Sequence, residues 1–386
     1  MQDMKRLIPI LSIAAALSLA ACQETVFTPR PTIPLVYSIL QDTSAAGHAV
    51  KDFVSEKGEC SIAVIGAPEE TILLAERMLT ADFVNNIDGS SRPDSLPDFS
   101  GERIQLILDA VNSPYENFIG KDTDALRAAV VGLSVFAMDS TCRMNPFSPE
   151  NMQPKQRSRV LVFSSSLISE FGKFDVDTLL QLSGARPHTL SPVQALLEEA
   201  LTGGDNVNIG VWASPYVAGS RVYEAEHSRM GGASSIKVLN TAEEGLAGGF
   251  RDILTQYRNS GAPLPMNVLL LDNFGMRADE LMAEADSIRA GYWEDDMALS
   301  KVMAKDFRIV EATSAVSRSC YRMMRRENLF THNIFYPKAS LYRTEKERTG
   351  KTVLAVLSER YFTDSYIDFM DANAATTRSF YVPDID

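Results

Sequence analysis

Residues 35–47 read LVYSILQDTSAAG, an apolar run followed by a polar one. The apolar part, Leu35–Leu40, has the length and composition of a buried strand, and the polar part begins where that strand would end. Further apolar runs follow along the chain, separated by amphipathic segments of helical length. Because runs that are apolar throughout suit strands covered on both faces, this alternation predicts a mostly parallel sheet flanked by helices. The predicted fold class is α/β and Rossmann-like, with a smaller α+β region at the C-terminal end.

The remaining strands and helices are predicted from the same patterns. Further strands are expected at Ser61–Ile65, Arg103–Val111, Arg159–Ser164, Asn206–Trp212, Ser235–Leu239 and Met266–Asp272. Helices are expected at Glu69–Ile87, Thr123–Met138, Thr241–Tyr257 and Arg277–Arg289, and another is expected to begin at Pro192 and to stop at Gly203-Gly204. Ser191 before Pro192 is typical of a helix N-cap, and Thr241 with Glu244 has the spacing of a capping box.

The polar end of the first predicted strand carries Asp42 and Ser44 in an Asp-x-Ser pattern. With the order of strands and helices over residues 34–258, this pattern resembles the von Willebrand factor A (VWA) domain, whose metal-ion-dependent adhesion motif begins with Asp-x-Ser. The resemblance implies that Asp42, Ser44 and Thr123 bind Mg²⁺ or another divalent cation, which prefers oxygen ligands. It also implies that an open coordination position accepts a carboxylate from a partner protein.

Two positions depart from the adhesion motif. Ala46 stands where a second Ser is expected, and Ser165 stands where the third loop normally carries an Asp. A site left with one carboxylate is a weak magnesium site. The same residues also have purely structural interpretations: Asp42 and Thr123 suit the start of a helix, and Ser164–Ser166 suits the polar end of a strand.

The first residues of the chain are predicted to form a secretory signal, residues 1–21. Two cations precede the apolar run Leu7–Leu19, which is too short to span a membrane. The sequence Leu-Ala-Ala-Cys that ends at Cys22 resembles the bacterial lipobox, which implies acyl chains on Cys22 and attachment to a membrane. Gln23 after the cysteine implies the outer membrane, with the body of the protein facing the periplasm. An ordinary secreted protein with a cysteine beside its cleavage site is the alternative.

The composition limits the classes of partner. The net charge is −13 and 45% of the residues are hydrophobic, so a packed core is expected and nucleic acid is an unsuitable partner. Cys60 and Cys142 are expected in one domain and are the candidate disulfide in an oxidising compartment. The other interpretation is that these two cysteines and Cys320 are small buried hydrophobic residues.

The predicted organisation has four parts, and a break with Gly261, Pro263 and Pro265 separates the last two. The parts are the signal (1–21), a lipidated tether (22–33), the VWA-like domain (34–260) and a C-terminal α+β region (261–386).

The sequence shows no catalytic motif. It lacks the Gly-x-Ser-x-Gly nucleophile motif and a phosphate-binding Gly-rich loop, and its four His residues have no metal-binding spacing. We therefore predict a protein that is not an enzyme, an envelope lipoprotein that acts through protein–protein interaction as an assembly, scaffold or adhesion component. The alternatives are a lipid-anchored solute-binding protein of an importer, with lobes 34–258 and 265–386, and an envelope hydrolase.

Overall fold

The computed structural model describes residues 30–41, 44–55, 61–143, 152–202, 204, 206–231, 233–243, 245–331, 333, 335–344 and 362–365. The chain from Thr32 onward forms one compact unit. No helix in these ranges is both long enough and apolar enough to cross a membrane.

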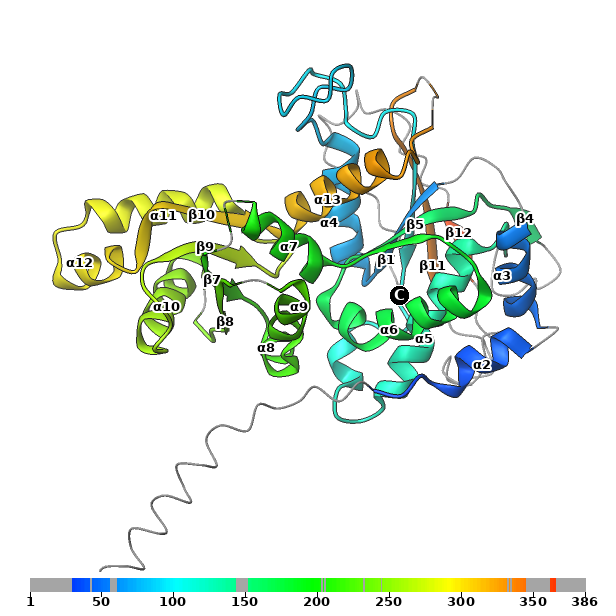
Figure 1. Ribbon diagram of the computed structural model, residues 1–386, viewed down its shortest axis with the longest axis horizontal. Helices are drawn as coiled ribbons and strands as arrows, with labels where there is room; N and C mark the ends of the chain where they lie inside the picture. Colours follow the sequence, from blue (N-terminus) through cyan, green and yellow to red (C-terminus); the bar gives the residue numbers. More distant parts are fainter. Residues whose placement is uncertain are drawn as a thin grey trace, which may run out of the picture. The chain divides into compact units, whose positions relative to one another are not determined.

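Two β-sheets organise this unit (Figure 1). Sheet A contains β1 (Ser61–Gly66), β2 (Arg103–Leu108), β3 (Thr141–Arg143), β4 (Met152–Pro154), β5 (Ser158–Phe163), β6 (His188–Leu190), β11 (Lys338–Thr344) and β12 (Phe362–Ser365), in the order β4-β3-β12-β11-β2-β1-β5-β6. Its five strands from β11 to β6 are parallel, and β12 runs antiparallel to β11.

Sheet B is smaller and entirely parallel. Its strands are β7 (Asn208–Trp212), β8 (Ser235–Leu239), β9 (Met266–Leu271) and β10 (Met303–Glu311), in the order β10-β9-β7-β8. The chain enters sheet B after β6 and returns from β10 to β11 of sheet A, so it crosses between the sheets twice.

Helices cover both sheets. They are α2 (Pro34–Gln41), α3 (Ala45–Ser55), α4 (Pro68–Thr80), the short 3₁₀ helix η2 (Tyr115–Phe118), α5 (Thr123–Met138), α6 (Ser166–Ser183), α7 (Pro192–Leu201), α8 (Pro215–Ser220), α9 (Val222–Met230), α10 (Leu246–Asn259), α11 (Ala278–Ala290), α12 (Glu294–Ser300) and α13 (Ala312–Arg326). Figure 1 shows α4 and α13 on one side of sheet A and α5 and α6 on the other. The helices α7 and α13 make the two crossings between the sheets and pack against each other.

The two sheets share a hydrophobic core. Side chains of a strand alternate between its faces, and β9 follows this rule: Val268 and Leu270 join the large core around sheet A, whereas Leu269 and Leu271 join a second core beneath α10 and α11. One face of sheet B is therefore packed into the core of sheet A.

The predicted α/β class, with mostly parallel strands flanked by helices, is confirmed. The prediction of a strand at Leu35–Leu40 is wrong, because this segment lies within α2. Val36 and Ile39 are its buried residues, and Tyr37 between them is half exposed. A spacing of three between buried positions is that of a helix, whereas a strand would bury alternate residues.

The segment that was predicted to separate two regions lies within the fold of sheet B. Strand β9, from the predicted region 261–386, pairs with β7 from the predicted domain 34–260. Strand β11 from the same C-terminal region pairs with β2 in sheet A. Both regions thus contribute strands to both sheets, which is incompatible with lobes 34–258 and 265–386 of a solute-binding protein.

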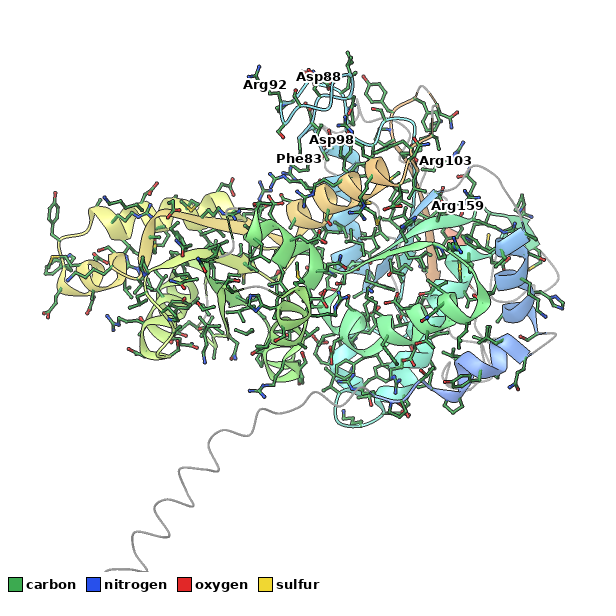
Figure 2. The ribbon with its side chains drawn as sticks, in the orientation of Figure 1. Phe83, Asp88, Arg92, Asp98, Arg103 and Arg159 are labelled. Carbon is green, nitrogen blue, oxygen red and sulfur yellow. The ribbon has the colours of Figure 1, made fainter. Side chains whose placement is uncertain are left out.

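The segment between α4 and β2 projects from the fold (Figure 2). Asp98 organises it by accepting hydrogen bonds from the backbone N–H groups of Phe83 and Val84, at 2.9 and 3.2 Å. The guanidinium groups of Arg77 and Arg318 lie over the Phe83 ring, 4.8 and 4.6 Å from its centroid. These contacts attach the segment to α4 and α13.

Candidate functional site

A cavity of about 380 Å³ lies where the carboxyl ends of the strands of the two sheets meet. Its lining residues are Glu69, Glu70 and Leu73 of α4, Glu116 of η2, Ser165, Ser166 and Leu167 at the start of α6, Trp212–Pro215 and Val217 around the start of α8, Thr241 after β8, and Asp272–Met276 after β9. In open parallel sheets, ligands bind in the crevice outside the carboxyl ends of the strands. The position of this cavity makes it the candidate functional site.

The turn between β1 and α4 places two carboxylates on the cavity wall. Gly66 ends the strand and Pro68 starts the helix, so Glu69 and Glu70 fall in its first turn. A Cβ on Gly66 would lie 2.0 Å from the Ser164 hydroxyl oxygen, which means that a larger residue at this position would push β1 and β5 apart. The absence of a side chain at Gly66 therefore helps to position Glu70.

Two neighbouring serines connect the carboxylates to the start of α6. Ser165 is the N-cap, and its hydroxyl accepts a hydrogen bond from the backbone N–H of Leu167 at 3.3 Å. Ser166 donates a hydrogen bond to Oδ1 of Asp272, with 2.5 Å between the oxygens. Since Ser166 follows β5 of sheet A and Asp272 follows β9 of sheet B, this bond joins the two sheets at the cavity.

The carboxyl group of Glu70 is unusual in its environment. Burial, with added repulsion from Asp272 and Glu116, raises its pKa from 4.5 to about 8, whereas a hydrogen bond from Ser165 lowers it. Its Oε2 atom is buried and has no hydrogen-bond partner in the part of the chain that the structure describes. A buried polar atom without a partner carries a free-energy cost, and such atoms are found where a ligand or catalysis uses them.

Asp272 is also held in a partly neutral state. Burial raises its pKa from 3.8 to about 7, and the hydrogen bond from Ser166 opposes this shift. The fully buried Tyr223 of α9 lies beside it, and burial together with the Asp272 carboxylate raises the pKa of the Tyr223 hydroxyl. Two carboxyl groups with pKa values near neutrality thus face one cavity, one from each sheet. Groups poised in this way are suited to general acid and base catalysis.

A further polar layer lies behind Glu70. Tyr115 of η2 is buried, and burial with the nearby Asp109 and Glu70 carboxylates raises the pKa of its hydroxyl. Oδ1 of Asp109 accepts hydrogen bonds from Asn112 Nδ2 and Thr344 Oγ1 at 2.7 and 3.0 Å. Glu70 therefore adjoins a buried tyrosine hydroxyl group that lies near a second carboxylate.

Ser44 and Thr123, two of the residues predicted as metal ligands, have structural roles at the starts of helices. Asp42 lies outside the described residues, Ser44 caps α3 by accepting a hydrogen bond from Gly47 N–H at 3.1 Å, and Thr123 is the first residue of α5, which Asp122 caps. Neither Ser44 nor Thr123 lines the cavity. Among the described residues, no group of three or more His, Cys, Asp or Glu side chains is placed to hold a metal ion.

The predicted Cys60–Cys142 disulfide stays a prediction, because Cys60 lies outside the described residues, whereas Cys142 is buried. Residues 1–29, which include the predicted signal and Cys22, also lie outside them. Acylation of Cys22 and location in the cell envelope therefore remain predictions.

Several solved structures are similar to this chain in fold. A glutamate racemase from Bacillus anthracis matches with a TM-score of 0.48 and 13% identity, over 74% of this chain and 89% of that chain. A glutamate racemase from Francisella tularensis, in complex with D-glutamate, matches with a TM-score of 0.45 and 15% identity, over 78% and 92% of the two chains. An aspartate racemase homologue from Pyrococcus horikoshii matches with a TM-score of 0.40 and 12% identity, over 69% and 99%. No protein-family model and no curated protein matches the sequence.

These observations correct the functional predictions. The interpretation as a VWA-like domain that acts through envelope protein partners is wrong: its predicted first strand is the helix α2, and its strands form two sheets instead of one. The prediction that the chain is not an enzyme is also corrected, because the cavity holds two carboxyl groups suited to catalysis. The alternatives of a solute-binding protein and an envelope hydrolase have no support in this architecture.

Sequence reasoning missed Glu70 and Asp272, although each follows a strand that it predicted. Both residues lie where ligands bind in open parallel sheets, outside the carboxyl ends of the strands. Asp272 was assigned to a separate C-terminal region, however, so it was not considered together with a residue about 200 positions earlier. Ser165 was considered as a departure from the adhesion motif or as part of a polar strand end, yet the structure places it in the cavity beside Glu70.

Proposed function

We propose that this protein is an enzyme that transfers protons to and from a small polar substrate in the cavity between its two sheets. Glu70 and Asp272 are the acid and the base. The observation that carries the proposal is the pair of carboxyl groups, contributed by different sheets to one cavity, whose pKa values of about 8 and about 7 lie near neutral pH.

The chemistry follows from the burial of both groups, which raises both pKa values, with repulsion from Asp272 adding to the shift of Glu70. Near neutral pH the pair retains about one proton, so one carboxyl group is ionised while the other is protonated. The ionised group removes a proton from the substrate and the protonated group returns one, so the two groups exchange protonation states and solvent restores them. Racemisation, epimerisation and tautomerisation are reactions of this kind. Amino-acid racemisation, the activity named for the structures of similar fold, belongs to the same class.

The cavity also suits a substrate of limited size. Its volume is at the lower end of the range for small-molecule sites. The hydrogen bond from Ser166 fixes the Asp272 carboxyl group. The hydrogen bond from the Leu167 N–H fixes Ser165, the serine beside Glu70, so both carboxyl groups are positioned before a ligand binds.

Deuterium exchange tests this proposal even while the product is unidentified. The full chain is incubated in D₂O with pooled amino acids and small hydroxy acids, and loss of each C–H signal is followed by proton NMR. We expect at least one compound to exchange, and the exchange to be absent in Glu70→Gln and Asp272→Asn. Glu280→Gln, an exposed change on α11, is the matched control. Exchange that is unaffected by both site variants would overturn the proposal.

A further inference from the structure

We propose that the substrate of this cavity is a small cation, a primary ammonium group on an aliphatic stem, and that the cavity rejects molecules with a second carboxylate. This inference rests on the proposed function, because it names the substrate class for the same cavity. It predicts a preference unlike that suggested by the names of the glutamate and aspartate racemases of similar fold.

The charge of the lining is the first argument. Four lining residues are carboxylic acids, namely Glu69, Glu70, Glu116 and Asp272, and none of the described residues that line the cavity is Lys, Arg or His. A substrate carboxylate would meet like charge in a partly desolvated site, where such repulsion is much stronger than in water. A substrate cation would meet the complementary charge.

The buried Oε2 of Glu70 is the second and independent argument. It has no donor among the described residues, although Ser165 contributes a hydrogen bond to the same carboxyl group. An ammonium group carries three N–H donors and no acceptor, which matches a carboxylate oxygen that lacks a partner. A ligand of this type would remove the cost of leaving Oε2 unsatisfied.

The apolar part of the lining is the third argument. Trp212, Val217, Phe274 and Leu167 are buried side chains on the cavity wall, and they provide a surface for an unbranched aliphatic stem.

Three amino acids of similar length test the inference by isothermal titration calorimetry on the full chain. L-lysine carries an extra ammonium group, L-norleucine has the same stem without it, and L-glutamate carries an extra carboxylate. We expect L-lysine to bind at least about tenfold more tightly than L-norleucine, the equivalent of about 1.4 kcal/mol, with L-glutamate weakest. Equal affinities, a preference for L-glutamate or no binding of L-lysine would overturn the inference.

A change at Glu116 tests the electrostatic cause. Glu116→Gln is expected to reduce the preference for L-lysine over L-norleucine several-fold, and Glu280→Gln to leave it unchanged. Glu116→Arg should increase the affinity for L-glutamate, a gain that misfolding cannot produce. If L-glutamate binds Glu116→Arg no better than the unchanged protein, charge does not determine the preference.

The pH dependence of binding gives a further readout. A cation binds the ionised carboxylates, so affinity for L-lysine should rise from pH 6 to pH 9, while that for L-norleucine changes less. The titratable groups that face Glu70 or Asp272 are Glu69, Glu116, Tyr115 and Tyr223, and Asp109 lies beside Tyr115. A lysine affinity that falls over this range would contradict the inference.

The two proposals fail separately. Proton exchange on L-glutamate with no binding of L-lysine would preserve the enzyme and overturn the substrate class. Binding of L-lysine with no exchange on any compound would preserve the cationic site and overturn the reaction.

Discussion

The two ends of sheet A both bury a titratable side chain, but the two side chains differ in their hydrogen-bond partners. At the amino ends of β2 and β5, Lys155 is almost fully buried, and burial lowers its pKa to about 7. Its Nζ donates hydrogen bonds to Gln105 Oε1, the Ala137 carbonyl and the Gln156 carbonyl, at 3.2, 3.2 and 2.9 Å. At the carboxyl ends, Glu70 has a similarly large pKa shift, but its Oε2 has no partner among the described residues.

The difference shows that a shifted pKa does not by itself identify a functional site. Lys155 uses all three of its donors and also lies 4.8 Å from the centroid of the Phe136 ring, so its ammonium group has no donor left for a ligand. The carboxyl end combines a shifted pKa with an unsatisfied atom and an open cavity. We therefore expect substitutions at one end to affect stability and substitutions at the other to affect turnover.

The largest expected effect is that of Glu70→Gln. It keeps the size of the side chain but removes the ability to exchange a proton, which typically contributes about 10²–10⁴-fold to a rate. We expect proton exchange to fall by about this factor, with a melting temperature at pH 7 close to that of the unchanged protein, because Glu70 is largely neutral there. Steady-state kinetics measure the exchange rate, and calorimetry measures the melting temperature. Full activity in Glu70→Gln would remove this residue from the mechanism.

Lys155→Met is expected to lower the stability of the fold and to leave the rate of proton exchange unchanged. Methionine approximates the length of lysine but removes the donor to Gln105 Oε1 and the Ala137 carbonyl, a loss of about 1–3 kcal/mol in the free energy of unfolding. The Gln156 carbonyl keeps its hydrogen bond from Gln105 Nε2. Urea denaturation measures this loss, and the exchange rate of the folded fraction should be unchanged. A large fall in the rate with unchanged stability would place Lys155 in the functional machinery and end the distinction between the two sheet ends.

Opposite pH slopes of stability sharpen the same comparison. The pKa of Glu70 is raised, so the folded protein binds more protons than the unfolded chain between about pH 4.5 and 8, and stability falls as pH rises through this range. The pKa of Lys155 is lowered, so the unfolded chain binds more protons between about pH 7 and 10.5, and stability rises there.

Variants assign each slope to its residue. In Glu70→Gln the fall between pH 4.5 and 8 should become shallower, with Asp272 retaining its own share, and in Lys155→Met the rise above pH 7 should disappear. Urea unfolding at intervals of one pH unit measures both. Identical slopes in all three proteins would show that neither group has the pKa assigned to it.

The strands could be predicted from the sequence far better than the site. Strands β1, β5, β8 and β9 were located to within one or two residues, because each is a short segment rich in apolar residues, and Ser191 was identified correctly as the N-cap of α7. The segment Leu35–Leu40 failed because so short an apolar run fits a strand and a helix equally well, and packing of Val36 and Ile39 decided between them.

The site was beyond reach for a different reason. It depends on which strands share a sheet, and the chain leaves sheet A after β6 and returns only at β11. Local patterns carry no information on how the chain passes from one sheet to the other, so nothing in the sequence placed Asp272 near Ser166 and Glu70. Burial, which causes the pKa shifts of both carboxyl groups, is likewise a property of the assembled fold.

Ser166→Ala has the smallest expected effect and examines the link between the sheets. The Ser166 hydroxyl donates a hydrogen bond to Asp272 and lowers the pKa of that carboxyl group. In a plot of the exchange rate against pH, one limb reports the ionisation of Asp272. Removal of the hydroxyl should move this limb upward by about 0.5 to 1 pH unit, the equivalent of one ordinary hydrogen bond. At a pH above this limb the rate should be nearly restored, a pattern that a general loss of structure would not give. Ser169→Ala is the control, because Ser169 donates to the Ser165 carbonyl instead of a carboxylate and should leave the limb in place. If both variants move the limb equally, the hydrogen bond between the sheets does not determine the pKa of Asp272.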